Sequence, residues 1–314
     1  MMNKRAKTEY EWQLEQLAND TKFNQWIERR YNITVQDLIA RVHDGVIRIN
    51  KNTIVTPQQM VDFYQMEQSL NDDAEDVDQT YLDKDDLKSK IKDRTEVFKA
   101  TSMINQKEYL KSTMGLILVG LGIALAVKIG KKLYQDASDE NKRQNMLNLK
   151  YAKVKPTIWS SRKVKKLIYA NTKTQSFSNK LWADIDSLKA TVDDVISKGV
   201  AVGMSNQDMA KYLQKELRKN VANKKYVTER LARTESAKVE FQVQYMMAKE
   251  QGFHYVKWHA EPSACKTCRD ISEEQPTKYD AGVYRLSDVP VIPIHPNCRC
   301  SISTYYPYYP YRSD

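Results

Sequence analysis

The chain has 314 residues, which is long enough for two domains that each bury a core. Nine glycines and nine prolines are few for that length, so long segments lack turn-forming residues and a mostly helical protein is expected. The mean hydropathy of −0.67 marks the bulk of the chain as soluble, and we expect no secretory signal because residues 1–14 are polar and charged.

Five segments are expected along the chain. A helical N-terminal region for docking or assembly covers residues 1–110, an apolar segment covers 111–132, and a basic helical body covers 150–252. A small C-terminal module of helix and strands covers 253–304, and a tail rich in tyrosine and proline covers 305–314. The predicted fold class is therefore mainly α with a small C-terminal α+β module.

Two sequence signals predict helix starts in the N-terminal region. Thr34 and the three residues after it fit a capping box ahead of the apolar Leu38 and Val42. Thr56 followed by Pro57 is typical of an N-cap with proline at the first helical position. These signals predict separate helices beginning near residues 34 and 57.

The apolar segment is the most hydrophobic part of the chain. From Met114 to Val127 fourteen residues follow one another without a polar side chain, and three glycines interrupt the helix pattern. With Ser112 and Thr113 the uncharged span would be about 24 Å long as a helix, which is shorter than the roughly 30 Å hydrocarbon core of a bilayer. Its length favours a buried or subunit-interface helix, and membrane contact through residues 112–130 is the alternative.

The net charge of +10 is concentrated in the basic body. Between residues 150 and 250 there are 21 lysines and arginines against 10 aspartates and glutamates. Such a region can face DNA or an acidic protein, or it can be the solvated surface of helices. The apolar pattern predicts three helices here: one ending near Gly199, one capped by Ser205, and one from about Ala222 to Glu250 that Gly252 ends.

Arg233, Thr234 and Glu235 form a short motif on the last of these predicted helices. Residues two apart on a helix project about 200° apart, so Arg233 and Glu235 cannot pair with each other. Each is expected to tie the helix to a different neighbour. A catalytic role would need a nucleophile or base that converges on the motif, and the sequence nominates none.

All four cysteines lie near the end of the chain, with a histidine among them. Cys265 and Cys268 form one close pair, Cys298 and Cys300 form the second, and His295 precedes the second pair. Two pairs of soft ligands separated by a long spacer are typical of a tetrahedral structural Zn²⁺ site. Four of these five residues are expected to bind the metal, with Cys265 and Cys268 the surest.

The choice among the other three donors stays open at this stage. Neighbours two apart in a strand point to opposite faces, so Cys298 and Cys300 can share a metal only if the chain turns at Pro296 and Asn297. Otherwise His295 supplies a ligand with one of them, and a His295 that is not a ligand is expected to hydrogen-bond behind the site. Two disulfides or four unconnected thiols are the competing readings of the cysteines.

These motifs resemble the C-terminal signature of the phage Mu F-like minor head proteins, the phage head-morphogenesis family. The resemblance rests on Trp258 ahead of the first cysteine pair, Gly282 in the spacer, the closing run of residues 295–300, and Arg233–Glu235 upstream. It covers roughly residues 155–303. The first cysteine turn lacks the aspartate that many relatives have there, and Glu261 is the nearest acid.

The resemblance implies a low-copy structural protein of the phage capsid and no established catalytic residue. Its partners would be the portal, the major capsid protein or both, and its role would be head morphogenesis, possibly with genome delivery. The protein would then be part of the virion, in the capsid interior or at the portal vertex, after assembly in the host bacterial cytoplasm. A sequence-tolerant DNA-binding protein is the alternative, and a toxin or nuclease-type enzyme is less favoured because too few residues follow the signature.

Overall fold

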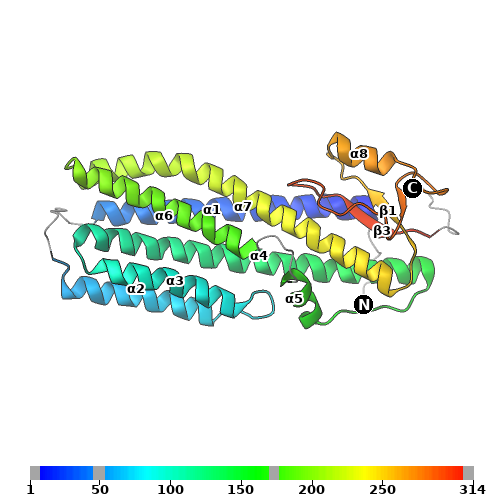
Figure 1. Ribbon diagram of the computed structural model, residues 1–314, viewed down its shortest axis with the longest axis horizontal. Coiled ribbons are helices and arrows are strands. Elements are labelled where there is room, and N and C mark those ends of the chain that lie inside the picture. Colours follow the sequence, from blue (N-terminus) through cyan, green and yellow to red (C-terminus); the bar gives the residue numbers. More distant parts are fainter. Residues whose placement is uncertain (1–7, 45–53, 170–176, 307–314) are drawn as a thin grey trace. The chain divides into compact units, whose positions relative to one another are not determined.

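A computed structural model describes residues 8–44, 54–169 and 177–306 and is mainly α, as predicted (Figure 1). Within those ranges the longest elements are helices α1, α4 and α7, and the only sheet has three short strands. In chain order the elements are α1 (Glu9–Asp44), α2 (Pro57–Glu75), α3 (Lys84–Ser102), α4 (Gln106–Ala152), α5 (Ser161–Tyr169), α6 (Phe177–Ala201), α7 (Asn206–Glu250), β1 (Tyr255–His259), α8 (Lys266–Glu273), β2 (Val283–Arg285) and β3 (Ser301–Thr304).

The chain divides into two compact units whose boundaries fall inside α1, α4 and α7. One unit, called here the C-terminal unit, consists of Met1–Phe23, Lys131–Asn171 and Arg230–Asp314. The other, called here the helical unit, consists of Asn24–Gly130 and Thr172–Glu229. Each unit therefore combines segments that are far apart in the sequence.

The helical unit buries the apolar segment of α4. The side chains of Met114, Leu118 and Leu125 are each at most 1% exposed. Two glycines let aromatic rings pack directly on the α4 backbone, because a Cβ at Gly122 would lie 2.5 Å from the Trp182 ring and would clash. The apolar segment thus forms part of the core of this unit.

In the described ranges, α4 alone is long and apolar enough to cross a membrane, judged by length and composition. Of its most apolar 18-residue stretch, 72% is buried inside the fold. Core helices pass the same test of length and hydropathy, so this finding is weak evidence for a membrane span. Membrane contact through residues 112–130 stays a prediction.

Helix starts in the structure differ from two of the predictions. α1 continues through Thr34, whose hydroxyl donates a hydrogen bond to the Arg30 carbonyl (3.1 Å) inside the helix, so the predicted cap there is wrong. α7 likewise begins at Asn206 and runs unbroken past Ala222. The cap at Thr56 is confirmed, because its hydroxyl accepts from the Gln59 amide in a full capping box.

The small sheet of the C-terminal unit has the strand order β2-β1-β3, and both pairings are antiparallel. Trp258 on β1 faces Ile302 on β3, and both side chains are at most 1% exposed. The core beneath the sheet also takes in Phe241 of α7 and three of the cysteines, Cys268, Cys298 and Cys300. The small C-terminal module of helix and strands is therefore confirmed, and the metal-ligand candidates lie at the edge of its core.

The start of the predicted tail packs onto the sheet. The Tyr305 amide donates to the Tyr255 carbonyl (3.0 Å), and the Tyr306 ring meets the Phe253 ring edge-on at 5.7 Å. Both tyrosines are buried. Residues 307–314, on which the rest of the tail prediction falls, lie outside the described residues.

Candidate metal centre

The first two candidate ligands come from the start of α8. Cys265 is the N-cap residue of that helix and its side chain makes no capping hydrogen bond, while Cys268 lies three residues later in the first turn. Side chains three apart lie on one face of a helix, so both sulfurs point the same way. Cys265 is exposed and Cys268 is buried, which places the pair at the boundary between solvent and core.

The His295 ring faces both of these sulfurs. Its Nε2 atom lies 3.3 Å from Cys265 Sγ and 3.4 Å from Cys268 Sγ. Its other ring nitrogen, Nδ1, lies 2.8 Å from the Pro296 carbonyl oxygen, which can only accept, so Nδ1 carries the proton. In the neutral ring Nε2 then presents its lone pair to the sulfurs, which is the tautomer a metal-binding histidine needs.

The second cysteine pair approaches from a turn. The Cys298 amide donates to the His295 carbonyl (3.1 Å), and Asn297 has a positive φ of 70°. Asparagine is among the few residues that tolerate this left-handed conformation, so the chain does turn at Pro296 and Asn297. It carries Cys298 to 4.0 Å from Cys268, measured between the Sγ atoms.

The five predicted donors form two overlapping groups that share Cys268. One group is Cys265, Cys268 and His295, and the other is Cys268, Cys298 and Cys300. Within each group all the candidate ligand atoms lie within 4.8 Å of one another. The four cysteines are free thiols, so the chain has no disulfide here. This cluster can hold a metal ion.

The thiols of the second pair differ in their protonation. A hydrogen bond from the Cys300 side chain lowers the pKa of Cys298 to about 5, while the same contact, together with burial, raises the pKa of Cys300. Burial raises the pKa of Cys268 to about 12. Cys298 is therefore the more acidic thiol of its pair, and Cys300 holds its proton more tightly.

Arg233 and Thr234 of α7 both hold the turn that carries the second cysteine pair. Arg233 Nε donates to the Asn297 carbonyl (2.8 Å), and the Asn297 amide donates to the Thr234 hydroxyl (3.1 Å). Arg233 also reaches the Glu261 carboxylate at 3.4 Å, just ahead of the first cysteine pair. Glu235 lies near Lys238 on its own helix, with 3.4 Å between the charged atoms. The motif thus contacts the metal cluster through its first two residues.

Arg299 is a functional residue that the sequence did not single out. Its side chain is buried and carries three charge-assisted hydrogen bonds, two to the Asp20 carboxylate of α1 and one to Glu240 of α7 (2.7 Å). Arg299 lies between Cys298 and Cys300, so this network anchors the cysteine loop to two helices of the same unit. From the sequence alone, an arginine between two cysteines is expected to be an exposed loop residue. Its anchoring role depends on Asp20 and Glu240, which are far away in the sequence.

We compared the chain with protein-family models, with curated proteins and with solved structures, and none of them matches it.

Proposed function

We propose that the chain is a structural minor head protein of a phage, associated with the portal, and that one Zn²⁺ holds its C-terminal module together. The observation that carries the proposal is the double contact of Arg233 and Thr234 with Asn297. The two sequence motifs that resemble the Mu F-like family are more than 60 residues apart, and they form one structural unit around the candidate metal centre. Motifs that matched by chance would have no reason to meet in this way.

Zinc is the metal that this donor set favours. Thiolates and a neutral imidazole are the ligands of structural zinc sites, and no carboxylate belongs to the cluster within the described residues. With Zn–S bonds of about 2.3 Å and Zn–N bonds of about 2.0 Å, the edges of a tetrahedral site are roughly 3.5–3.8 Å long. The Cys265–His295, Cys268–His295 and Cys268–Cys298 edges measure 3.3, 3.4 and 4.0 Å, close to these lengths. Cys298 does not share a group with Cys265 and His295, so closing the site would also bring Cys298 closer to them.

The four ligands we assign are Cys265, Cys268, His295 and Cys298. Cys300 then donates its S–H to the Cys298 sulfur, as the pKa shifts of this pair indicate. Four protein ligands leave no open position for water, which is the arrangement of a structural zinc site and not of a catalytic one. The metal would stabilise a module whose three short strands bury little surface without it.

A zinc assay on the purified full-length chain tests the metal proposal. We expect about one zinc ion per chain by elemental analysis, as a single four-ligand site requires. Strong chelation should lower the unfolding temperature, and re-addition of zinc should restore it. A chain that is purified from zinc-containing medium without metal, and whose unfolding is unchanged by chelation, contradicts the proposal.

The capsid role needs a separate experiment. Cryo-electron microscopy of heads that contain this chain should place it at the portal vertex in few copies. A tagged chain that is absent from purified particles and stays in the cell lysate would overturn the capsid assignment while leaving the metal site untouched.

A further inference from the structure

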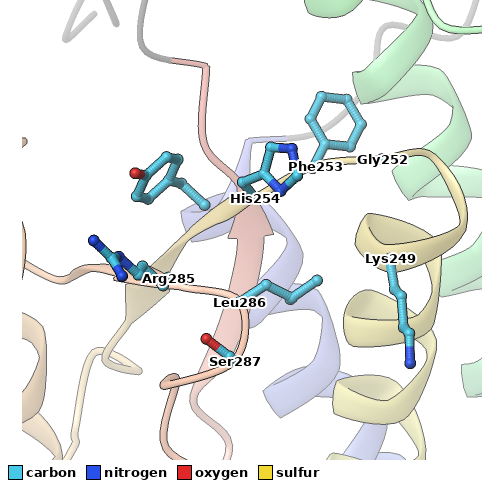
Figure 2. A pocket seen from close by; sticks show the side chains of 8 residues that line it. Lys249, Gly252, Phe253, His254, Arg285, Leu286 and Ser287 are labelled. Carbon is cyan, nitrogen blue, oxygen red and sulfur yellow. The ribbon is translucent and has the colours of Figure 1, made fainter.

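A surface pocket of about 470 Å³ lies where α7 ends and the small sheet begins (Figure 2). Its lining comes from three places in the chain that belong to the C-terminal unit. They are the last turn of α7, the chain that leads into β1, and the end of β2 with the turn after it. The lining residues are Lys249, Gly252, Phe253, His254, Tyr255, Arg285, Leu286 and Ser287.

The charge of this lining is positive. In Figure 2, Lys249 and Arg285 lie on opposite sides of Leu286, and His254 stands above it. Across the described part of the chain, no ion pair joins Lys249 or Arg285 to an acid, and no aspartate or glutamate lines the pocket. Both side chains are exposed. Their charged ends point away from each other in Figure 2, so each can attract a separate anionic group from solution at its own side of the pocket.

Two features near the pocket carry negative charge. The C-terminal end of α7 carries the negative end of the helix dipole, but its carbonyls are capped by the Gly252 and Phe253 amides at 3.2 and 2.9 Å. Asp288 is near in sequence, yet its carboxylate accepts a hydrogen bond from the Ser287 hydroxyl (2.8 Å) and does not line the pocket. One carboxylate beside the pocket thus stands against the two cations that line it, so the local charge stays positive.

Aromatic rings make up much of the remaining lining, and they are held in place. The Phe253 ring packs edge-on against Tyr306, and the Tyr255 ring packs edge-on against Tyr279 at 4.9 Å. Gly252 lies between α7 and these rings, and a Cβ there would meet no atom within 4 Å. Phe253 and Tyr255 are half-buried and His254 is exposed, and aromatic rings favour stacking with nucleobases.

We propose that this pocket binds a short segment of nucleotides, with one phosphate at Lys249, a second at Arg285 and a base against Phe253 and His254. The source of the nucleotide is a single strand of DNA, since cations beside exposed rings are the usual surface for unpaired bases. The site does not depend on the capsid assignment or on the zinc ligands, none of which line it.

Fluorescence anisotropy with the full-length, zinc-loaded chain tests this site. The probe is a labelled oligothymidylate of about twelve nucleotides, within the site sizes known for single strands. The site variant is Lys249→Gln with Arg285→Gln. The control variant is Lys211→Gln with Lys219→Gln, two exposed lysines of α7 outside the pocket, which gives the same change in net charge. Thermal unfolding checks that both variants keep the fold.

We expect the site variant to bind on the order of tenfold more weakly at low salt, with the control changed much less. The slope of log affinity against log salt should become shallower by roughly 1.4, because each phosphate contact on a single strand contributes about 0.7. His254→Ala should weaken binding of the oligothymidylate. It should change the affinity of inorganic phosphate, measured by competition with the probe, much less. Thymidine monophosphate is a further competitor. If it displaces the probe with the same affinity as the unlabelled strand, the site is supported and its ligand is a free nucleotide instead of a strand.

Two results would overturn the proposal. One is that the unmodified chain does not bind the oligothymidylate at low salt. The other is that the site variant and the control variant lose affinity equally, because the attraction would then come from net charge alone.

Discussion

Arg299 and Asp20 form a buried bidentate ion pair in the C-terminal unit. Arg299 Nε donates to one carboxylate oxygen of Asp20 at 2.8 Å, and Nη2 donates to the other at 2.6 Å. The Lys132 ammonium also lies 3.1 Å from Asp20, so the carboxylate serves two cations. The pair connects the cysteine loop to a helix nearly 280 residues earlier, and breaking it should affect the whole unit.

Asp20→Asn should therefore destabilise the protein strongly. Removal of one partner of a buried ion pair leaves an uncompensated charge and costs about 3–5 kcal/mol of unfolding free energy. Urea unfolding monitored by circular dichroism measures the loss. Asp139→Asn is the matched control, because Asp139 pairs with Lys142 at a site where both side chains are more than half exposed, and such pairs contribute about 0–1 kcal/mol. Equal small effects of both substitutions would contradict a buried network.

Glu240 should make the stability of the protein depend on pH. Burial raises the pKa of Glu240 to about 8, against the opposing charge of Arg299, and Asp136 and Glu140 raise it further. The folded state then holds a proton that the unfolded state has lost above its ordinary pKa of 4.5. This contribution is fully favourable below pH 4.5, and it is lost progressively as the pH rises to about 8.

Glu240→Gln removes this titration and keeps an oxygen that can accept from Arg299. The difference in unfolding free energy between the original chain and the variant should shrink or reverse as the pH increases from about 5 to about 8. Urea midpoints measured at several pH values report it, and the comparison cancels the pH dependence of metal binding, which both proteins share. A difference that is constant over this range would mean that Glu240 does not hold the proton.

The choice of metal ligands can be tested by single serine substitutions. Cys268→Ser should lower the zinc content from about one ion per chain to near zero, since Cys268 belongs to both donor groups. Cys300→Ser should keep the metal, because a serine hydroxyl can still donate to the Cys298 sulfur. Cobalt substitution provides the second readout, as its absorption spectrum distinguishes three thiolate ligands from four. His295 would be excluded as a ligand if Cys300→Ser loses the metal and the cobalt spectrum of the unmodified chain shows four thiolates.

Two neighbouring glycines of α4 should respond to alanine in opposite ways. A Cβ at Gly122 would lie 2.5 Å from the Trp182 ring, so Gly122→Ala overpacks the helical unit and should cost about 1–3 kcal/mol. At Gly120 the nearest atom would be a Leu70 methyl at 3.4 Å, and alanine is the better helix former by up to about 1 kcal/mol. Gly120→Ala should therefore be neutral or stabilising. Thermal unfolding of both variants checks this, and equal losses would show that α4 does not pack on Trp182.

The sequence by itself predicted the features that depend on neighbouring residues. The spacing of Cys265 and Cys268, and the turn at Asn297, are properties of a few consecutive residues, and the structure has both. The mainly α class followed from the scarcity of glycine and proline along the whole chain. The metal-ligand candidates were thus available before any tertiary information.

The tertiary structure decided what depends on partners far along the chain. Thr34 has the sequence of a cap, but packing of the buried Tyr31 and Leu38 on either side keeps α1 helical through it. The ion pair of Arg299 with Asp20 could not be predicted from the sequence, because it depends on the distance between the two side chains in space and not on their spacing in the chain. The contact of Thr234 with Asn297 exists only once the helices and the small sheet have packed together, and so does the pocket that Lys249 and Arg285 both line.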